Sequence, residues 1–202
     1  TVKFSGNGPI REIHSQADAL GNIRGYISNP NVDLEHEIGS INFSKAIGAA
    51  FLTVTKDIGL KEPYSGIIPL QFGKVASDIA YHLTTSEQVP SALIIGQNVE
   101  TDGTISSAGG ILIQTFPDTR EDVIIKVEER INSMKKNLGD ALNNGDDILT
   151  ILTELFNHKA LTLLDEKTIK ASCRCNKELL FNIIKGISDD ELKDMIEKDG
   201  GA

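Results

Sequence analysis

Residues 64–95, which read YSGIIPLQFGKVASDIAYHLTTSEQVPSALII, decide the fold class of this chain. Residues 64–70 contain the apolar pair Ile67-Ile68 and are typical of a short strand. Residues 73–86 place apolar side chains on one face of a helix, and residues 92–95 are again a short apolar strand. A strand, a helix and a strand inside an otherwise strand-rich stretch predict an α+β fold and not a doubly wound α/β fold.

Further strands are expected on both sides of this stretch. Residues 1–5 alternate apolar and polar side chains from the first position, as a half-buried strand does. Residues 23–27, 50–58 and 109–113 are short β-rich runs separated by turn residues. Residues 1–118 are therefore predicted to form a sheet-rich core domain.

The pattern changes after Pro117. Residues 120–138 and 147–156 each carry apolar side chains at helical spacing among many charges. Their apolar positions are Val123, Val127, Ile131, Ile148, Leu152 and Leu155. Short helices in water are marginal and depend on packing of their apolar face. Residues 119–172 are therefore predicted to be a helical linker that lies against another part of the protein.

A third segment, residues 173–202, begins with Cys173-Arg174-Cys175. A helix is expected over residues 176–185. A second helix is expected after the capping box Ser188-Asp189-Asp190-Glu191, ending at Gly200-Gly201. The last helix has no later segment to pack against, so residues 173–202 are either a flexible tail or part of a small zinc-binding domain.

Composition limits the classes of partner. The chain has 202 residues, 40% of them hydrophobic, and a formal net charge of −9. This length is enough for one or two domains, at roughly 100 to 200 residues per domain. Dispersed basic residues in an acidic chain argue against a nucleic-acid partner. No apolar run reaches the roughly 18 residues of a membrane span, and residues 1–6 lack the pattern of a secretory leader. We expect a cytoplasmic protein, or an organellar one if a transit peptide has been lost.

Catalytic signatures are missing from the sequence. The four histidines, His14, His36, His82 and His158, lie far apart and match no metalloprotease or hydrolase motif. The glycine pattern of a phosphate-binding loop is also absent. The sequence therefore predicts a protein that is not an enzyme.

The two cysteines are the residues with distinctive chemistry. A thiolate is both a zinc ligand and an oxidisable group, and Cys173 and Cys175 are close enough to reach one ion. Structural zinc sites need four ligands, so these two residues are half of such a site. From spacing alone, an incidental pair of thiols or a redox dithiol remains equally open.

Five motifs, taken in order, resemble the 33-kilodalton chaperonin family of redox-regulated holdases. They are Gly6-x-Gly8-Pro9, Arg24-Gly25, residues 64–70, Tyr81 followed by residues 86–90, and residues 108–114. Cys173-x-Cys175 falls where that family has its first two zinc ligands, and Asp199-Gly200 resembles the segment that leads to its second cysteine pair. The resemblance covers essentially the whole chain.

The resemblance implies an ATP-independent chaperone that is quiescent while zinc is bound to its reduced cysteines. Oxidation would convert the family's four cysteines, Cys173 and Cys175 among them, into two disulfides and release zinc. The zinc domain and the linker would then unfold, and unfolding client proteins could bind. It also implies a homodimer, an N-terminal segment before Thr1, and a second ligand pair beyond Ala202. A thiol oxidoreductase and a plain zinc-stabilised interaction module are the alternative functions.

Overall fold

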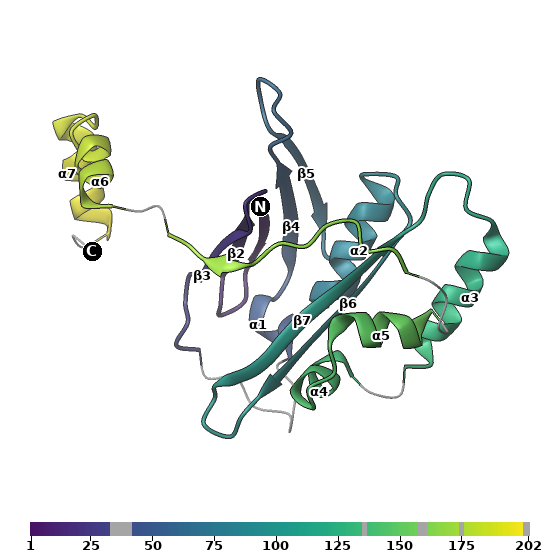
Figure 1. Cartoon of the computed structure of the whole chain (residues 1–202). Coiled ribbons are helices and arrows are strands. Elements are labelled where there is room, and N and C mark those ends of the chain that lie inside the picture. The colour runs from purple at the N-terminus through teal and green to yellow at the C-terminus, as the bar shows by residue number, and fades with distance from the viewer. Residues whose placement is uncertain (33–41, 135–136, 157–160, 174–175, 200–202) are drawn as a thin grey trace. The chain divides into compact units, whose positions relative to one another are not determined.

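The computed structural model describes residues 1–32, 42–134, 137–156, 161–173 and 176–199 (Figure 1). Two compact units are present. The first comprises Thr1–Gln16 and Gly25–Lys167, and the second comprises Ala17–Arg24 and Thr168–Ala202. Each unit is considered separately below.

Strands and helices alternate irregularly along the chain. The elements are β1 (Val2–Gly6), β2 (Glu12–Ala17), β3 (Asn22–Ile27), α1 (Phe43–Ile47), β4 (Ala50–Lys56), β5 (Tyr64–Pro69), α2 (Val75–Thr85), β6 (Ser91–Val99), β7 (Ile105–Gln114), α3 (Glu121–Asn132), α4 (Leu138–Asn143), α5 (Ile148–Leu155), β8 (Lys170–Ala171), α6 (Lys177–Ile184) and α7 (Asp189–Asp199). The predicted α+β class is confirmed.

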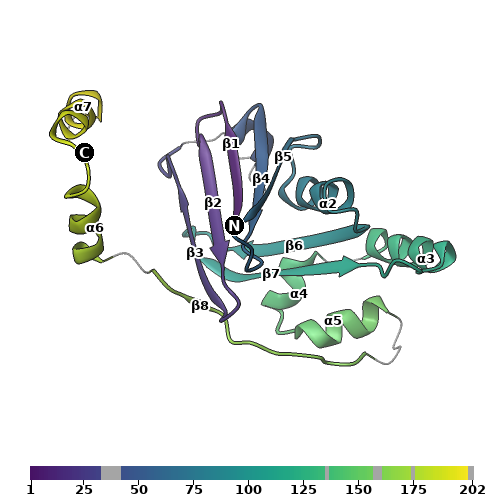
Figure 2. The same cartoon turned by 90° about the horizontal axis from the view of Figure 1, so that it is seen from above.

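The main sheet of the first unit has the strand order β5-β4-β1-β2, followed by the part of β3 from Gly25 onward (Figure 2). Its β1, β2, β4 and β5 pairings are antiparallel, with Phe4 opposite Ile13 on one side and Leu52 on the other. Alternate side chains of β4 are buried, among them Leu52 and Val54. They form a core with Phe4 and with Ile47 of α1. One face of this sheet therefore packs into the hydrophobic core.

The turn between β1 and β2 packs against the end of α1. Gly8 N donates to Ile47 O at 2.8 Å, and Ala49 N donates to the Asn7 side chain at 2.9 Å. A Cβ on Gly8 would lie 2.5 Å from Ala46 O, so only glycine fits this close approach. This contact explains the Gly6-x-Gly8 motif.

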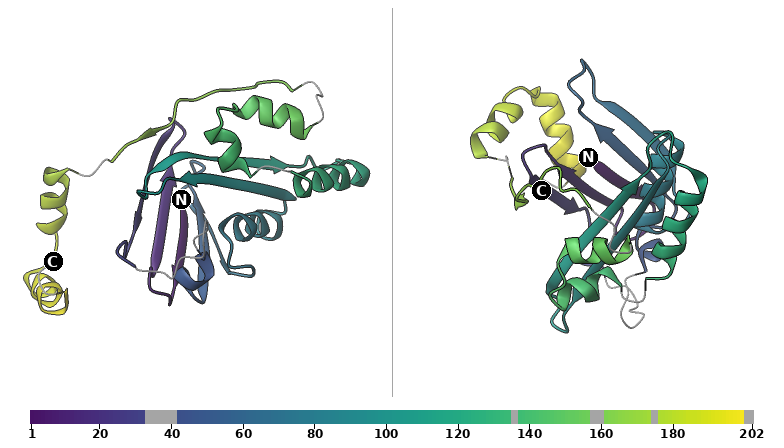
Figure 3. Two further views of the ribbon diagram at one scale, coloured as in Figure 1. Left: turned by 90° about the horizontal axis from the view of Figure 1, so that it is seen from below. Right: turned by 45° about the vertical axis from the view of Figure 1, so that its right-hand side comes forward.

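Strands β6 and β7 form a separate two-stranded antiparallel hairpin, with Ile94 opposite Ile111. Helices α4 and α5 lie along this hairpin, as Figures 1 and 3 show. A second core consists of the buried residues Ile111, Leu138, Ala141 and Ile151. Of the two helices expected after Pro117, the one over residues 147–156 packs on this hairpin as α5 through Ile151. Helix α3 has no buried residue and contacts α5.

Several details differ from the sequence prediction. Strands β2 and β8 and the short helix α1 were not predicted. The helix expected over residues 120–138 ends at Asn132, where the N–H of Ser133 bonds to the carbonyls of the last turn. A new helix begins at Leu138 because Asn137 Oδ1 accepts the N–H of Asp140 at 2.8 Å and caps it.

The helices over residues 73–86, 147–156 and 176–185 are confirmed as α2, α5 and α6. The capping box before α7 is also confirmed, because Ser188 and Glu191 exchange hydrogen bonds. The helix stop at Gly200-Gly201 lies outside the described residues. The functional division into residues 1–118, 119–172 and 173–202 stays a prediction.

Candidate functional site

Cys173 lies two residues after the short strand β8 in the second unit. Asn22 and Ile23 of β3 pair in parallel with Lys170 and Ala171, and Ser172 N donates to Ile23 O at 3.0 Å. This bond fixes the backbone immediately before the cysteine. Cys173 itself is exposed. An oxidant in solution can therefore reach its thiol.

The partner of β8 is held in place by a tight turn over residues 18–22. Asp18 Oδ1 accepts the N–H groups of Leu20 and Asn22 at 2.9 and 3.1 Å. The Asn22 side chain donates to the other carboxylate oxygen at 2.8 Å. The turn thus presents a rigid edge to which residues 170–172 attach.

Arg174 and Cys175 lie outside the described residues, as do His36 and His158. Within the described part of the chain, no three His, Cys, Asp or Glu side chains are grouped so that they could hold a metal ion. The thiol chemistry of Cys173 and Cys175 suits zinc, but two thiols fill only half of a four-ligand site. The zinc and disulfide roles of this pair stay predictions.

Two amphipathic helices follow the cysteine pair. Asn176 Oδ1 caps α6 by accepting the N–H of Leu179 at 2.7 Å. No residue of α6 is buried, and its apolar residues Leu179, Leu180, Phe181, Ile183 and Ile184 are all exposed. A helix without buried side chains gains little from tertiary packing. The order of this segment therefore depends on a weak set of contacts.

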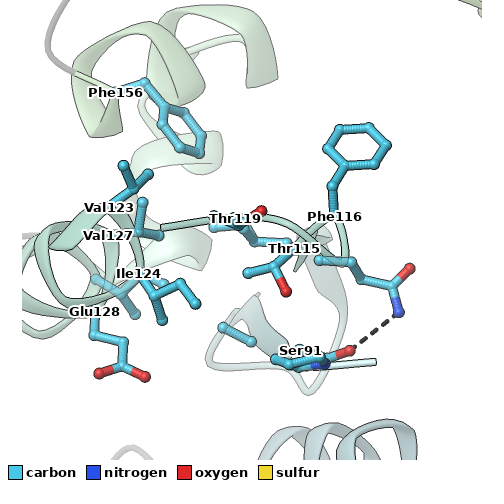
Figure 4. A pocket seen from close by; sticks show the side chains of 14 residues that line it. Ser91, Thr115, Phe116, Thr119, Val123, Ile124, Val127, Glu128 and Phe156 are labelled. Atoms are coloured by element: carbon cyan, nitrogen blue, oxygen red, sulfur yellow. Dashed lines mark hydrogen bonds between the residues drawn. The ribbon is translucent and has the colours of Figure 1, made fainter. Parts of the chain in front are cut away.

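An apolar cavity of about 250 Å³ lies in the first unit, between α3, the ends of β6 and β7, and the residue after α5. Val123 and Val127 of α3 line one side, and Phe156 closes another (Figure 4). At the strand ends, Gln114 Nε2 donates to Ser91 Oγ at 3.0 Å. The apolar face of α3 predicted from sequence thus borders a hollow and not a close-packed core.

The predicted linker residues are buried to different degrees. Val123 is 43% exposed, whereas Leu155 is 6% exposed and Ile148 is 38% exposed. Leu152 packs against the second core. Arg130 of α3 donates to Leu155 O at 3.2 Å and ties the two helices together. The segment α3 to α5 is attached to the β6–β7 hairpin mainly through α4 and α5.

A buried polar cluster, which the sequence did not point to, lies between α2 and β5. The His82 side chain is fully buried. Its imidazole lies in the space that a side chain at Gly66 of β5 would fill. Burial lowers the pKa of His82 below its ordinary value, against the opposing effect of the Glu87 carboxylate. Glu87 also pairs with Lys56 at 2.5 Å. His82 is therefore neutral at physiological pH.

Asp78 organises the start of the same helix. Its buried carboxylate accepts the backbone N–H groups of Gln71, Phe72 and Lys74 at 2.7, 3.0 and 2.9 Å. These bonds satisfy donors that would otherwise be orphaned before α2. Asp78 thus has a structural role at the start of α2.

Comparison with known proteins identifies the family. The family model described as Hsp33 protein matches residues 1–202. The chain belongs to the Hsp33 family. Hsp33 relatives include the 33 kDa chaperonin of Oceanobacillus iheyensis, 38% identical and covering all of this chain and 70% of the relative. The 33 kDa chaperonin of Syntrophotalea carbinolica is 40% identical over 98% of this chain and 69% of its own length.

The fold agrees with this Hsp33 assignment. The crystal structure of the 33 kDa chaperonin from Thermotoga maritima matches with a TM-score of 0.83 and 32% identity. The match covers 98% of this chain and 67% of that one. The predicted family is confirmed, and the chain is a chaperone and not an enzyme. No helix within the described residues is long and apolar enough to cross a membrane.

Proposed function

We propose that this Hsp33 chain is a redox-regulated, ATP-independent holdase that binds unfolding client proteins under oxidative stress. It would act in the cytoplasm, as a homodimer when active, without a nucleic-acid or membrane partner. The supporting observation is the way helices α4 and α5 pack on the β6–β7 hairpin. These short helices bury Ile111, Leu138 and Ile151, yet α3 has no buried residue.

Such a segment is suited to reversible release. Helices of 6 to 12 residues do not persist without tertiary packing. Their departure would expose apolar strand residues of the hairpin, such as Ile94, Ile111 and Ile113, together with the helices' own apolar faces. An exposed apolar surface of this kind can hold the apolar segments of an unfolding protein.

Cys173 and Cys175 would be the sensor. When zinc is bound, it keeps coordinating thiols in the thiolate form. Oxidation by a peroxide would join Cys173 Sγ and Cys175 Sγ in a disulfide. The two thiolates would lose two electrons, and the peroxide would take up these electrons and two protons from solvent to form two molecules of water. The exposure of Cys173 supports this role, because it makes the thiol accessible.

The sensor and the helices are joined by an extended stretch, residues 161–169, which has no helix or strand. Leu163 and Leu164 within it are exposed. Because few buried contacts hold this stretch, disorder that begins at residue 173 can spread toward α5 along the chain. This coupling is the part of the mechanism that converts thiol oxidation into client binding.

An aggregation assay tests the proposal. The natural protein, containing any further cysteines that it has, should suppress aggregation of thermally unfolding luciferase only after hydrogen peroxide treatment. That treatment should also release about one zinc per chain. Cys173→Ser should remove the response to peroxide. Equal protection before and after peroxide would contradict the proposal. Loss of a fixed partner on chelation alone, with no oxidant-dependent protection, would identify a zinc-stabilised interaction module instead.

A further inference from the structure

Helix α4 touches the β6–β7 hairpin through its backbone. A Cβ on Gly96 of β6 would overlap Gly139 N and would lie 2.7 Å from Leu138 Cβ. A Cβ on Gly139 would overlap the Gln97 carbonyl and would lie 2.7 Å from Gln97 N. Neither position has room for a side chain. The two backbones can approach this closely only because both residues are glycine.

Glycine is a costly residue in a helix, because it loses more backbone entropy on folding than alanine does. Gly139 is the second residue of a six-residue helix. Helix propensity alone would therefore favour alanine at this position. The contact with Gly96 and Gln97 offsets this cost, which indicates that close docking of α4 matters more than the stability of the isolated helix.

Hydrogen bonds fix both ends of the docked helix. Ser107 Oγ of β7 donates to Gly139 O at 3.0 Å, and Ser106 Oγ donates to the Asn143 side chain at 3.0 Å. Three of the six α4 residues, Leu138, Gly139 and Ala141, are buried. By comparison, α3 has no buried residue and the longer α5 has two. Helix α4 is therefore the anchor of the segment α3 to α5.

We propose that the Gly96–Gly139 contact is a latch that positions α4 and sets how readily residues 119–156 leave the β6–β7 hairpin. The inference rests on the proposed function, because the stability of this contact would decide how readily the apolar surface for client binding becomes exposed. Opening the latch removes Leu138 and Ala141 from the second core and leaves Ile151 without those neighbours. The docked helix therefore keeps the chaperone in its closed form under reducing conditions.

Gly139→Ala tests the latch under reducing conditions, with Gly110→Ala as the matched control. A Cβ on Gly110 would lie 3.5 Å from Ile94 O, an ordinary contact on the same hairpin. Hydrogen exchange of residues 138–143 should become roughly tenfold faster in Gly139→Ala, because local opening becomes more frequent. The same variant should protect thermally unfolding luciferase without peroxide. Gly110→Ala should match the wild type in both assays.

The opposite results are equally clear. If the contact did not matter, alanine would favour the helix and exchange would be slower, which would overturn the latch. Faster exchange with protection that still requires peroxide would overturn its regulatory role. Should Gly139→Ala fail to fold, Ser107→Ala removes only the hydrogen bond to Gly139 O and should give a smaller change in the same direction. If oxidised wild type also fails to protect luciferase, the proposed function fails, while the exchange data still decide the latch.

Discussion

His82 Nε2 lies 3.9 Å from Glu87 Oε1, and within the described residues neither atom has a hydrogen-bond partner. Lys56 binds the other Glu87 oxygen and fixes the carboxylate beside α2. The imidazole thus faces the Glu87 carboxylate, the Lys56 ammonium group and the space left by Gly66. A proton on His82 would have to be accommodated inside this packed cluster.

We predict that acid destabilises the first unit through His82. Burial lowers the pKa of His82 in the folded chain below 6.5, so the unfolded chain binds more protons in the interval between the two pKa values. The contribution of His82 to the free energy of unfolding should be constant above about pH 6.5. It should fall as the pH drops from there toward the pKa of His82 in the folded chain. Urea unfolding at several pH values measures this. His82→Gln should flatten the curve in that interval, and an unchanged slope would contradict the assignment.

Gly66→Ala should destabilise the same cluster. The added Cβ would lie 2.6 Å from His82 Cε1, and overpacking of this kind costs about 1 to 3 kcal/mol. Combining it with His82→Ala should recover part of the loss, because the shorter side chain vacates the space. A double-mutant cycle by urea unfolding checks the coupling. Additive effects of the two substitutions would show that Gly66 and His82 do not interact.

Ile151→Ala should loosen the helical segment. Ile151 is 6% exposed in the second core, and replacing a buried isoleucine by alanine costs about 2 to 5 kcal/mol. Ile148→Ala is the matched control on the same helix, since Ile148 is 38% exposed and should cost less. Thermal or urea unfolding gives the comparison. Similar losses for both variants would mean that α5 is not held by its Ile151 face.

Leu142→Ala should make room beside Gly109, where α4 contacts β7. A Cβ on Gly109 would lie 2.6 Å from Leu142 Cδ1, the flexible end of a side chain, so Gly109→Ala alone should be tolerated better than Gly139→Ala. In the Leu142→Ala background, the added cost of Gly109→Ala should become small. Hydrogen exchange of residues 138–143 in the four chains provides the measurement. A Gly109→Ala effect that is the same with and without Leu142 would exclude this contact as its cause.

The elements predicted best were those with a clear apolar period. The strand over residues 64–70, the α2 face and the capping box at Ser188 depend on local patterns, and the structure confirms them. Strand β2, with the sequence EIHSQA, has little apolar periodicity, and its pairing with β1 determines its conformation. Such tertiary pairing leaves no signal in a single sequence.

The candidate site was predicted only in its chemistry. Cys173 and Cys175 were identifiable from thiol chemistry together with the family resemblance, whereas Gly96 and Gly139 have no motif that separates them from turn glycines. Their role depends on two backbones, 43 residues apart in sequence, meeting across the hairpin. His82 was likewise indistinguishable from an ordinary core histidine until its neighbours were known.

Hydrogen exchange of the α5 amides, residues 148–155, in reduced and peroxide-treated natural protein tests the central claim most directly. The account predicts slow exchange in the reduced protein, because Ile151 and Leu155 are buried, and much faster exchange after oxidation. Cys173→Ser should keep the slow exchange after peroxide. If oxidised protein holds thermally unfolding luciferase while these amides remain as protected as in the reduced form, release of the helical segment is not how this chaperone is activated.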